Sequence, residues 1–179
     1  AIQIAQPSTA CQHFHLLRRQ ALRSWRKPLI VFTPKSMLRH KAASARIQEL
    51  SRPRFWNVLP ERHLEAAKRV VMCTGKIGHE LRAARARRSD ASTAVLSLEQ
   101  LYPFPIPEYA ALLEQYSHVD EIVWCQEEPQ NQGAWYQIKH RLQEPLKDSQ
   151  QLYYAGRPGA AAPGRAGVRG GTFRGAHAR

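Results

Sequence analysis

The sequence predicts an α/β protein built on a doubly wound, mostly parallel sheet. Short apolar runs of strand type alternate four times with segments whose apolar residues recur at helical spacing. Such runs are typical of strands that a parallel sheet buries on both faces. With 179 residues, 43% of them hydrophobic, the chain can bury the core of one domain, or of one domain and a piece of another.

The first three elements form a strand–helix–strand unit. A strand is predicted over residues 2–5, and Ser8 or Thr9 can cap a helix that continues to about Arg23. Pro28 precedes a second apolar strand over residues 29–32. This order and length are typical of a parallel crossover, or of the last part of one. Spacing predicts that the apolar side of the helix consists of Cys11, Phe14, Leu17 and Ala21.

Residues 41–68 have a weaker pattern, in which Arg, Pro and Ser are mixed with scattered apolar residues. This composition predicts a segment between domains, with Phe55 and Trp56 pinning it to a core.

A second series of elements starts near Arg69. Residues 70–73 are a strand, Thr74-Gly75-Lys76 a tight turn, and residues 77–88 a helix that is apolar at Ile77, Leu81 and Ala84. Its outer face is expected to be basic, with Arg82, Arg85, Arg87 and Arg88. The remaining predictions are strands over residues 93–98, 122–125 and 152–155, a proline-rich turn over 102–107, and helices over 109–116 and about 131–146.

The stretch from 119 to 135 ends an apolar strand at Gln126-Glu127-Glu128-Pro129. Pro129 predicts a turn there, after which Asn131 can cap the next helix. Polar groups between a strand's carboxyl end and the next helix are where open α/β sheets place ligands. The alternative is an ordinary corner whose polar residues only close the turn, and the spacing does not decide between the two.

The net charge of +13 is concentrated in residues 18–54 and in the last two dozen residues. No stacking-aromatic pattern accompanies it, which argues against nucleic-acid binding. Arg18, Arg19, Arg23, Arg26 and Lys27 form a basic stripe on the first helix. This stripe is either a solvated helix end or an anion-binding surface, such as one for a phosphate-bearing metabolite or an acidic partner.

Cys11, Cys73 and Cys125 are far apart and lie among apolar neighbours, which favours free thiols in a reducing compartment. The histidines include no H-x-x-x-H pair, so a zinc site is not expected. No apolar run approaches the ~18 residues of a membrane span. The chain begins at Ala1 inside a strand-like run, and we expect it to be a fragment.

Two positions at the predicted strand ends could carry chemistry. Thr74-Gly75-Lys76 follows a strand and opens a helix, where an anion is favoured, but it lacks the upstream glycine and the following Ser/Thr of a P-loop. His40 follows the second strand, where a catalytic or substrate-binding group can lie. A lone histidine can equally be a surface residue.

Five segments together resemble one family. They are P-L-I-V-F-T-P-K-S-M-L-R-H (residues 28–40), R-V-V-M-C-T-G-K (69–76), E-Q-L-Y-P-F-P (99–105), Q-E-E-P-Q-N-Q-G-A-W (126–135) and Y-A-G-R-P (154–158). They are similar to the C-terminal end of the decarboxylating first component of the 2-oxoglutarate dehydrogenase complex. The resemblance covers residues 1 to about 163, while the family's proteins are several times longer.

The resemblance implies four segments. Residues 1–40 would be the tail of a transketolase-like pyrimidine-binding domain, 41–67 an interdomain linker, and 68–158 a transketolase C-terminal-like domain. Residues 159–179 depart from the family: they are rich in Ala, Gly, Arg and Pro, as a frameshift in GC-rich DNA would produce. We expect that tail to be disordered.

The family's chemistry is implied in the same way. Its members use thiamine diphosphate with Mg²⁺ to decarboxylate 2-oxoglutarate in the tricarboxylic acid cycle, act as homodimers and pass the succinyl group to a lipoyl-bearing succinyltransferase. The segments that bind the cofactor and metal lie upstream, so neither is expected to bind within this chain, and we expect no independent turnover. The protein would be cytoplasmic in a bacterium and lie in the mitochondrial matrix of a eukaryote.

Six residues are assigned by the resemblance. His40 matches a histidine near the active centre and would contact substrate or relay a proton. A regulatory acyl-CoA or nucleotide site would involve Thr74, Lys76, Gln126, Gln132 and Gly133. Two other possibilities stay open: a basic α/β module that binds nucleic acid or anions, and a degenerate gene product without activity.

Overall fold

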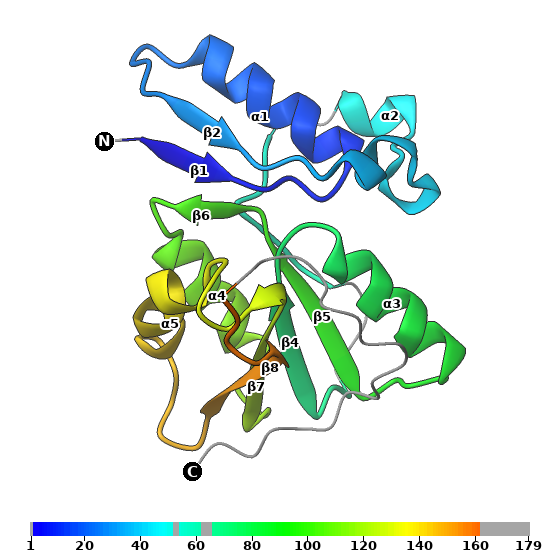
Figure 1. The fold of residues 1–179 in the computed structure, drawn as a ribbon, viewed down its shortest axis with the longest axis vertical. Helices are drawn as coiled ribbons and strands as arrows, with labels where there is room; N and C mark the ends of the chain where they lie inside the picture. The colour runs from blue at the N-terminus through cyan, green and yellow to red at the C-terminus, as the bar shows by residue number, and fades with distance from the viewer. Residues whose placement is uncertain (1, 52–53, 62–65, 162–179) are drawn as a thin grey trace.

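The computed structural model describes residues 2–51, 54–61 and 66–161 of the chain (Figure 1). Its strands form two sheets, one of three strands in the order β2-β1-β6 and one of five in the order β3-β5-β4-β7-β8. The predicted α/β class is therefore confirmed. Figure 1 shows the smaller sheet with α1 at one end of the molecule and the larger sheet, with α3, α4 and α5, below it.

The first unit is the predicted crossover. β1 (Gln3–Ala5) and β2 (Leu29–Val31) pair in parallel, and α1 (Ala10–Leu22) connects them. Thr9 caps α1, because its hydroxyl accepts a hydrogen bond from the backbone N–H of Gln12 at 3.2 Å.

The face that α1 buries differs from the prediction. Its buried residues are Gln12, His15 and Leu16, whereas Phe14 is 43% and Leu17 50% exposed. The reason is that α1 packs through hydrogen bonds on the segment around Trp56, whose backbone N–H and C=O groups need polar partners. The Gln12 side chain donates to the Trp56 carbonyl oxygen (2.7 Å) and accepts from the Trp56 N–H (3.2 Å).

The connection between the sheets contains two 3₁₀ turns, η1 (Lys35–Arg39) and η2 (Lys41–Ala43), followed by α2 (Ile47–Leu50) and β3 (Val58–Leu59). Phe55 is buried against Ala5 and Leu16, as predicted, while Trp56 is 42% exposed. β3 joins the larger sheet as an antiparallel neighbour of β5.

The larger sheet is parallel apart from β3. Its other strands are β4 (Arg69–Cys73), β5 (Thr93–Leu98), β7 (Glu121–Pro129) and β8 (Gln151–Arg157). Alternate residues of β4 point to opposite faces: Val70 and Met72 lie in the core under α4 (Ile106–Glu114) and α5 (Trp135–Gln143), and Val71 lies under α3 (Ile77–Arg87). Helices on both faces confirm the doubly wound prediction (Figure 1).

A strand that sequence did not predict links the two sheets. β6 (Gln100–Tyr102) pairs antiparallel with β1, and Glu99 alone separates it from β5 of the larger sheet. The chain therefore passes directly from one sheet into the other at Glu99. The proline-rich turn that follows begins with a cis peptide bond between Tyr102 and Pro103.

Three local predictions are wrong. β7 does not stop at Gln126 but continues to Pro129, where it pairs with Arg157 of β8. Asn131 does not cap α5, which begins at Trp135; its side chain bonds the backbone of Ala160 instead. α5 also ends at Gln143 rather than near residue 146.

The outer face of α3 is less basic than predicted. Arg85 donates to the Glu61 carboxylate at 2.9 Å, and Arg82 donates to the Val95 carbonyl and the Ser97 hydroxyl at 2.9 and 3.0 Å. Glu61, from the connection, attracts both guanidinium groups toward the sheet, which spacing along α3 could not reveal.

Of the predicted tail 159–179, all but three residues lie outside the described residues. No helix within the described part of the chain is long and apolar enough to cross a membrane.

We predict that Gly75→Ala destabilises the fold by about 1–3 kcal/mol. Gly75 has φ +65°, which strains any residue with a Cβ, and the added carbon would also collide with the Gln6 side chain. Urea unfolding measures the loss. Gly159→Ala is the matched control, because its Cβ would lie 3.5 Å from the nearest atom, and it should leave the unfolding midpoint unchanged. Equal midpoints for both variants would contradict the tight approach of Gln6 to this turn.

Candidate functional site

Polar side chains meet where β1, β4 and β5 end. We call Ser8, His40, Thr74, His79 and Glu99 the junction cluster. The carboxyl ends of parallel strands lie at the same edge of a sheet. Here the ends of strands from both sheets lie close together, because β6 directly follows β5 in the chain and pairs with β1.

Glu99 is the centre of this cluster. Its side chain is fully buried, and Oε2 accepts hydrogen bonds from the Ser8 N–H (2.7 Å) and the Gln12 side-chain amide (3.5 Å). Its Oε1 has no hydrogen-bond partner. A buried carboxylate oxygen without a donor is costly, so the site favours a carboxyl group that keeps its proton.

Burial raises the pKa of the Glu99 carboxyl to about 7, although the hydrogen bonds from Ser8 and Gln12 and the charge of Arg82 act in the opposite direction. The group can therefore hold or release a proton near neutral pH, which is the property required of a general acid or base.

Two imidazole rings lie on the same side of the junction. The His79 Nε2 is 2.7 Å from the Ser8 carbonyl oxygen, which can only accept, so Nε2 carries the hydrogen. The His40 ring lies 5.1 Å from the His79 ring, centre to centre. Burial, together with the charges of Arg82 and His40, lowers the pKa of His79, so its ring is held neutral at physiological pH.

His40, predicted to contact substrate, lies at the end of η1, and its Nδ1 is buried without a hydrogen-bond partner. The half-buried ring packs against the His79 ring at an interplanar angle of 35°, and His79 in turn is bonded to the segment after β1. The structure thus connects His40 to Glu99 through His79 and Ser8. This connection holds the His40 ring beside the junction cluster.

The residues predicted for a regulatory site lie at neighbouring strand ends. Lys76 is 2.8 Å from Glu80 and 3.5 Å from Glu127 at the end of β7, and both carboxylates raise its pKa. Thr74 is buried, and its hydroxyl donates to the Leu98 carbonyl at 2.8 Å. The hydroxyl of Thr74 therefore stabilises the sheet, while the Lys76 ammonium group is at the surface.

Gln126 has no hydrogen-bonding capacity left for a ligand. Its carbonyl oxygen accepts from the Trp124 indole and the Trp135 N–H, at 2.9 and 3.1 Å, and its amide donates to the carbonyl oxygens of Pro129 and Gln132, at 3.1 and 2.7 Å. Gly133, with φ +67°, closes the loop around this amide. The loop is thus a structural corner, whose exposed part consists of Asn131 and Gly133 with the half-buried Gln132.

Sequence reasoning missed Glu99, His79 and Ser8 as members of a common cluster. Glu99 directly follows the buried run Thr93–Leu98, and that position at a strand's carboxyl end is a signal that could have identified it. The contacts of Ser8 and His79 depend on β6 pairing with β1, which no local pattern indicates. Among the described residues, no group of three or more His, Cys, Asp or Glu side chains could hold a metal ion.

Comparison with known proteins identifies close relatives. Residues 44–169 match the family model described as 2-oxoglutarate dehydrogenase C-terminal. The chain is 49% identical over 165 residues to the 2-oxoglutarate dehydrogenase E1 component of Cupriavidus necator, covering 90% of this chain and 17% of that protein. The E1 components of Haemophilus influenzae and Coxiella burnetii are 46% and 45% identical, each over 90% of this chain and 18% of the relative. The chain therefore spans less than a fifth of these relatives.

We predict that Glu99 makes stability fall as pH rises. Below its ordinary pKa of 4.5, the carboxyl is protonated in the folded and unfolded chains alike. Between 4.5 and about 7, the unfolded chain releases the proton and the folded chain retains it, so folding becomes less favourable, by about 3 kcal/mol in all. Above that range both states are ionised and the effect is constant.

The measurement is urea unfolding from about pH 4 to pH 8, for the wild type and Glu99→Gln. The amide of the variant cannot ionise. The decrease in the free energy of unfolding between pH 4 and pH 8 should therefore be smaller in the variant, by about 3 kcal/mol. His79, whose lowered pKa acts with the opposite sign, is common to both proteins and cancels in the difference. Parallel pH profiles would show that the pKa of Glu99 is the same in the folded and unfolded chains, and would contradict the prediction.

Proposed function

The chain belongs to the 2-oxoglutarate dehydrogenase C-terminal family, and we propose that it acts as the C-terminal part of a 2-oxoglutarate dehydrogenase first component. The reaction is the oxidative decarboxylation of 2-oxoglutarate and the transfer of the succinyl group to a lipoyl group. The observation that carries the proposal is 49% identity to the Cupriavidus necator E1 component across 90% of this chain.

The proposed domain boundaries follow the two sheets. Residues 1–40 complete a pyrimidine-binding domain whose other elements lie upstream, residues 41–67 link it to the next domain, and residues 68–158 form the C-terminal domain. Two features support this division. In the described residues β2 has a neighbour on one side only, and Phe32 at its end is 50% exposed. Further strands and helices of a larger domain would cover both features.

His40 is the proposed contact to the reaction centre. Its support is its place after β2 and the unpaired Nδ1, which is free to bond a group brought by the remainder of the protein. His79 and Glu99 act through it: they fix the ring and can hold a proton close by.

The cofactor implied by the family is thiamine diphosphate with Mg²⁺, which supplies carbanion stabilisation when bound. Among the described residues, no group of three or more His, Cys, Asp or Glu side chains could hold a metal ion. From the family resemblance, we propose that upstream segments hold both the metal and the diphosphate of the cofactor.

The remaining proposals concern regulation and assembly. Of the five residues expected to bind an acyl-CoA or nucleotide, Lys76, Gln132 and Gly133 have exposed surface for it, whereas Thr74 and Gln126 would act only by shaping the loops. The proposed partners are a second copy of the whole protein and a lipoyl-bearing succinyltransferase. The relatives named above are bacterial, which supports a cytoplasmic location.

We predict that the isolated chain releases no CO₂ from 2-oxoglutarate when supplied with thiamine diphosphate and Mg²⁺. A chimera in which this chain replaces the aligned segment of the Cupriavidus necator relative should catalyse that release, because the missing cofactor segments are then present. The measurement is 2-oxoglutarate-dependent reduction of an artificial electron acceptor. A chimera that folds and dimerises but has no activity would contradict the proposal.

In the same chimera, His40→Ala should lower kcat by roughly a hundredfold, the usual contribution of a positioned proton-transfer group. His140→Ala is the matched control, because His140 is an exposed histidine in the last turn of α5, and it should leave kcat unchanged. Equal activity of the two variants would exclude His40 from the reaction.

A further inference from the structure

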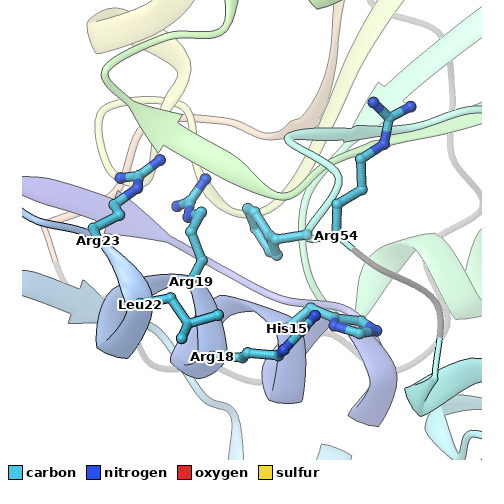
Figure 2. A pocket seen from close by; sticks show the side chains of 7 residues that line it. His15, Arg18, Arg19, Leu22, Arg23 and Arg54 are labelled. Atoms are coloured by element: carbon cyan, nitrogen blue, oxygen red, sulfur yellow. The ribbon is translucent and has the colours of Figure 1, made fainter.

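A second polar site lies farther along α1 than the junction cluster, toward the C-terminal end of this helix. A pocket of about 270 Å³ opens between α1 and the segment before β3 (Figure 2). In Figure 2 the Arg19 and Arg23 side chains rise from α1 next to each other, and Arg54 lies across from them. Among the residues that the structure describes, no carboxylate lines the pocket. Its lining consists of His15, Arg18, Arg19, Leu22, Arg23, Arg54 and Phe55.

Three of the pocket's arginines, Arg19, Arg23 and Arg54, form no ion pair with a described carboxylate. Arg19 donates to the side-chain oxygens of Asn57 (2.9 Å) and Gln100 (2.7 Å), and Arg23 donates to Gln3 (2.6 Å). All three acceptors are neutral amides, which fix the direction of a guanidinium group without cancelling its charge. No described carboxylate lies within 4.0 Å of the charged groups of Arg19, Arg23 or Arg54.

The half-buried cations Arg19 and Arg23 also repel each other. Burial, and next the charge of Arg23, lowers the pKa of Arg19 to about 10, while Glu108 acts weakly in the opposite direction. The Arg19 guanidinium lies over the Phe55 ring, 4.4 Å from its centre, so part of it is removed from water. A bound anion would relieve both the repulsion and the loss of solvation.

His15 provides an independent observation. It is 2% exposed, and its Nε2 lies 3.2 Å from the Glu49 carbonyl oxygen, to which it must donate. Its Nδ1 is buried without a partner, although the ring lines the pocket. Buried unpaired nitrogen atoms are rare and need an explanation. A ligand whose polar group bonds Nδ1 would give one.

We propose that this pocket binds a small molecule through a phosphate or diphosphate group. Guanidinium forks match the oxygens of phosphate in geometry and charge, and four of the described residues that line this pocket are arginines. The apolar surface of Leu22 and Phe55 leaves room for an organic part of the ligand. This site is separate from the residues proposed for catalysis and regulation, and it does not depend on the proposed function.

The first test is calorimetric titration of the full 179-residue chain with pyrophosphate, inorganic phosphate, AMP and, as a carboxylate comparison, succinate, at constant ionic strength. Pyrophosphate should bind, and succinate should bind at least about tenfold more weakly. AMP binding more tightly than inorganic phosphate would identify a nucleotide as the source of the phosphate; the reverse order would identify the free ion. Absence of pyrophosphate binding at millimolar concentration would overturn the proposal.

The second test separates the pocket from general basic charge. Arg54→Ala should weaken pyrophosphate binding about tenfold, whereas Arg26→Ala, which removes an equal charge outside the pocket, should change it less than about twofold. Circular dichroism checks that each variant is folded. If Arg54→Ala does not fold, Arg23→Gln takes its place in the test. Equal losses in the Arg54 and Arg26 variants would overturn the site.

The third test locates the ligand. Amide chemical-shift changes on addition of pyrophosphate should centre on His15 and Phe55. Changes centred on Gly75 and Lys76 would place the phosphate at the turn after β4 and contradict the pocket. Tighter binding of duplex DNA than of pyrophosphate, with a steep salt dependence, would also contradict it and favour a nucleic-acid surface.

Discussion

The structure depends on the bend at Glu99, where one continuous stretch of chain leaves the larger sheet and enters the smaller one. Its backbone N–H bonds Asn57 (2.8 Å), its carbonyl oxygen accepts from Gln6 (2.8 Å), and its side chain accepts from Ser8 (2.7 Å). One residue thus ties together β5, the exit of β1 and the connection between the sheets. Because these bonds are buried, separating the sheets would leave several polar groups unpaired, at a cost of about 1–3 kcal/mol each.

This bend also explains why titratable groups gather at the junction. Apolar clusters lie on both faces of the larger sheet, and the charges that reach it from α3, on Arg82 and Arg85, are paired with Glu61. At the carboxyl ends of β1, β4 and β5, backbone N–H and C=O groups no longer have partners on a neighbouring strand. Polar side chains must satisfy these groups there. His40, His79 and Glu99 meet there as a result of how the sheets join, and a proton can be held at the same place.

The strongly apolar strands could be predicted from sequence: β4 and β5 were assigned to within a residue because both of their faces are buried. The buried face of α1 could not, since Gln12 and Arg19 pack through hydrogen bonds to a distant segment, and hydrophobic periodicity does not register such contacts. β6 is three residues long and exists through its pairing with β1, about 95 residues away in the chain. The catalytic prediction at His40 rested on a family motif; its link to Glu99 required the fold.

Native-state hydrogen exchange tests most directly whether the two sheets behave as one cooperative body. The amide of Gln6 bonds Glu99 at the bend, and that of Met72 lies in the centre of the larger sheet. If the sheets are joined as described, both amides should exchange through the same global opening, with free energies within about 1 kcal/mol of each other. An opening free energy for Gln6 several kcal/mol below that of Met72 would show that the small sheet opens by itself, and would contradict the central role of Glu99.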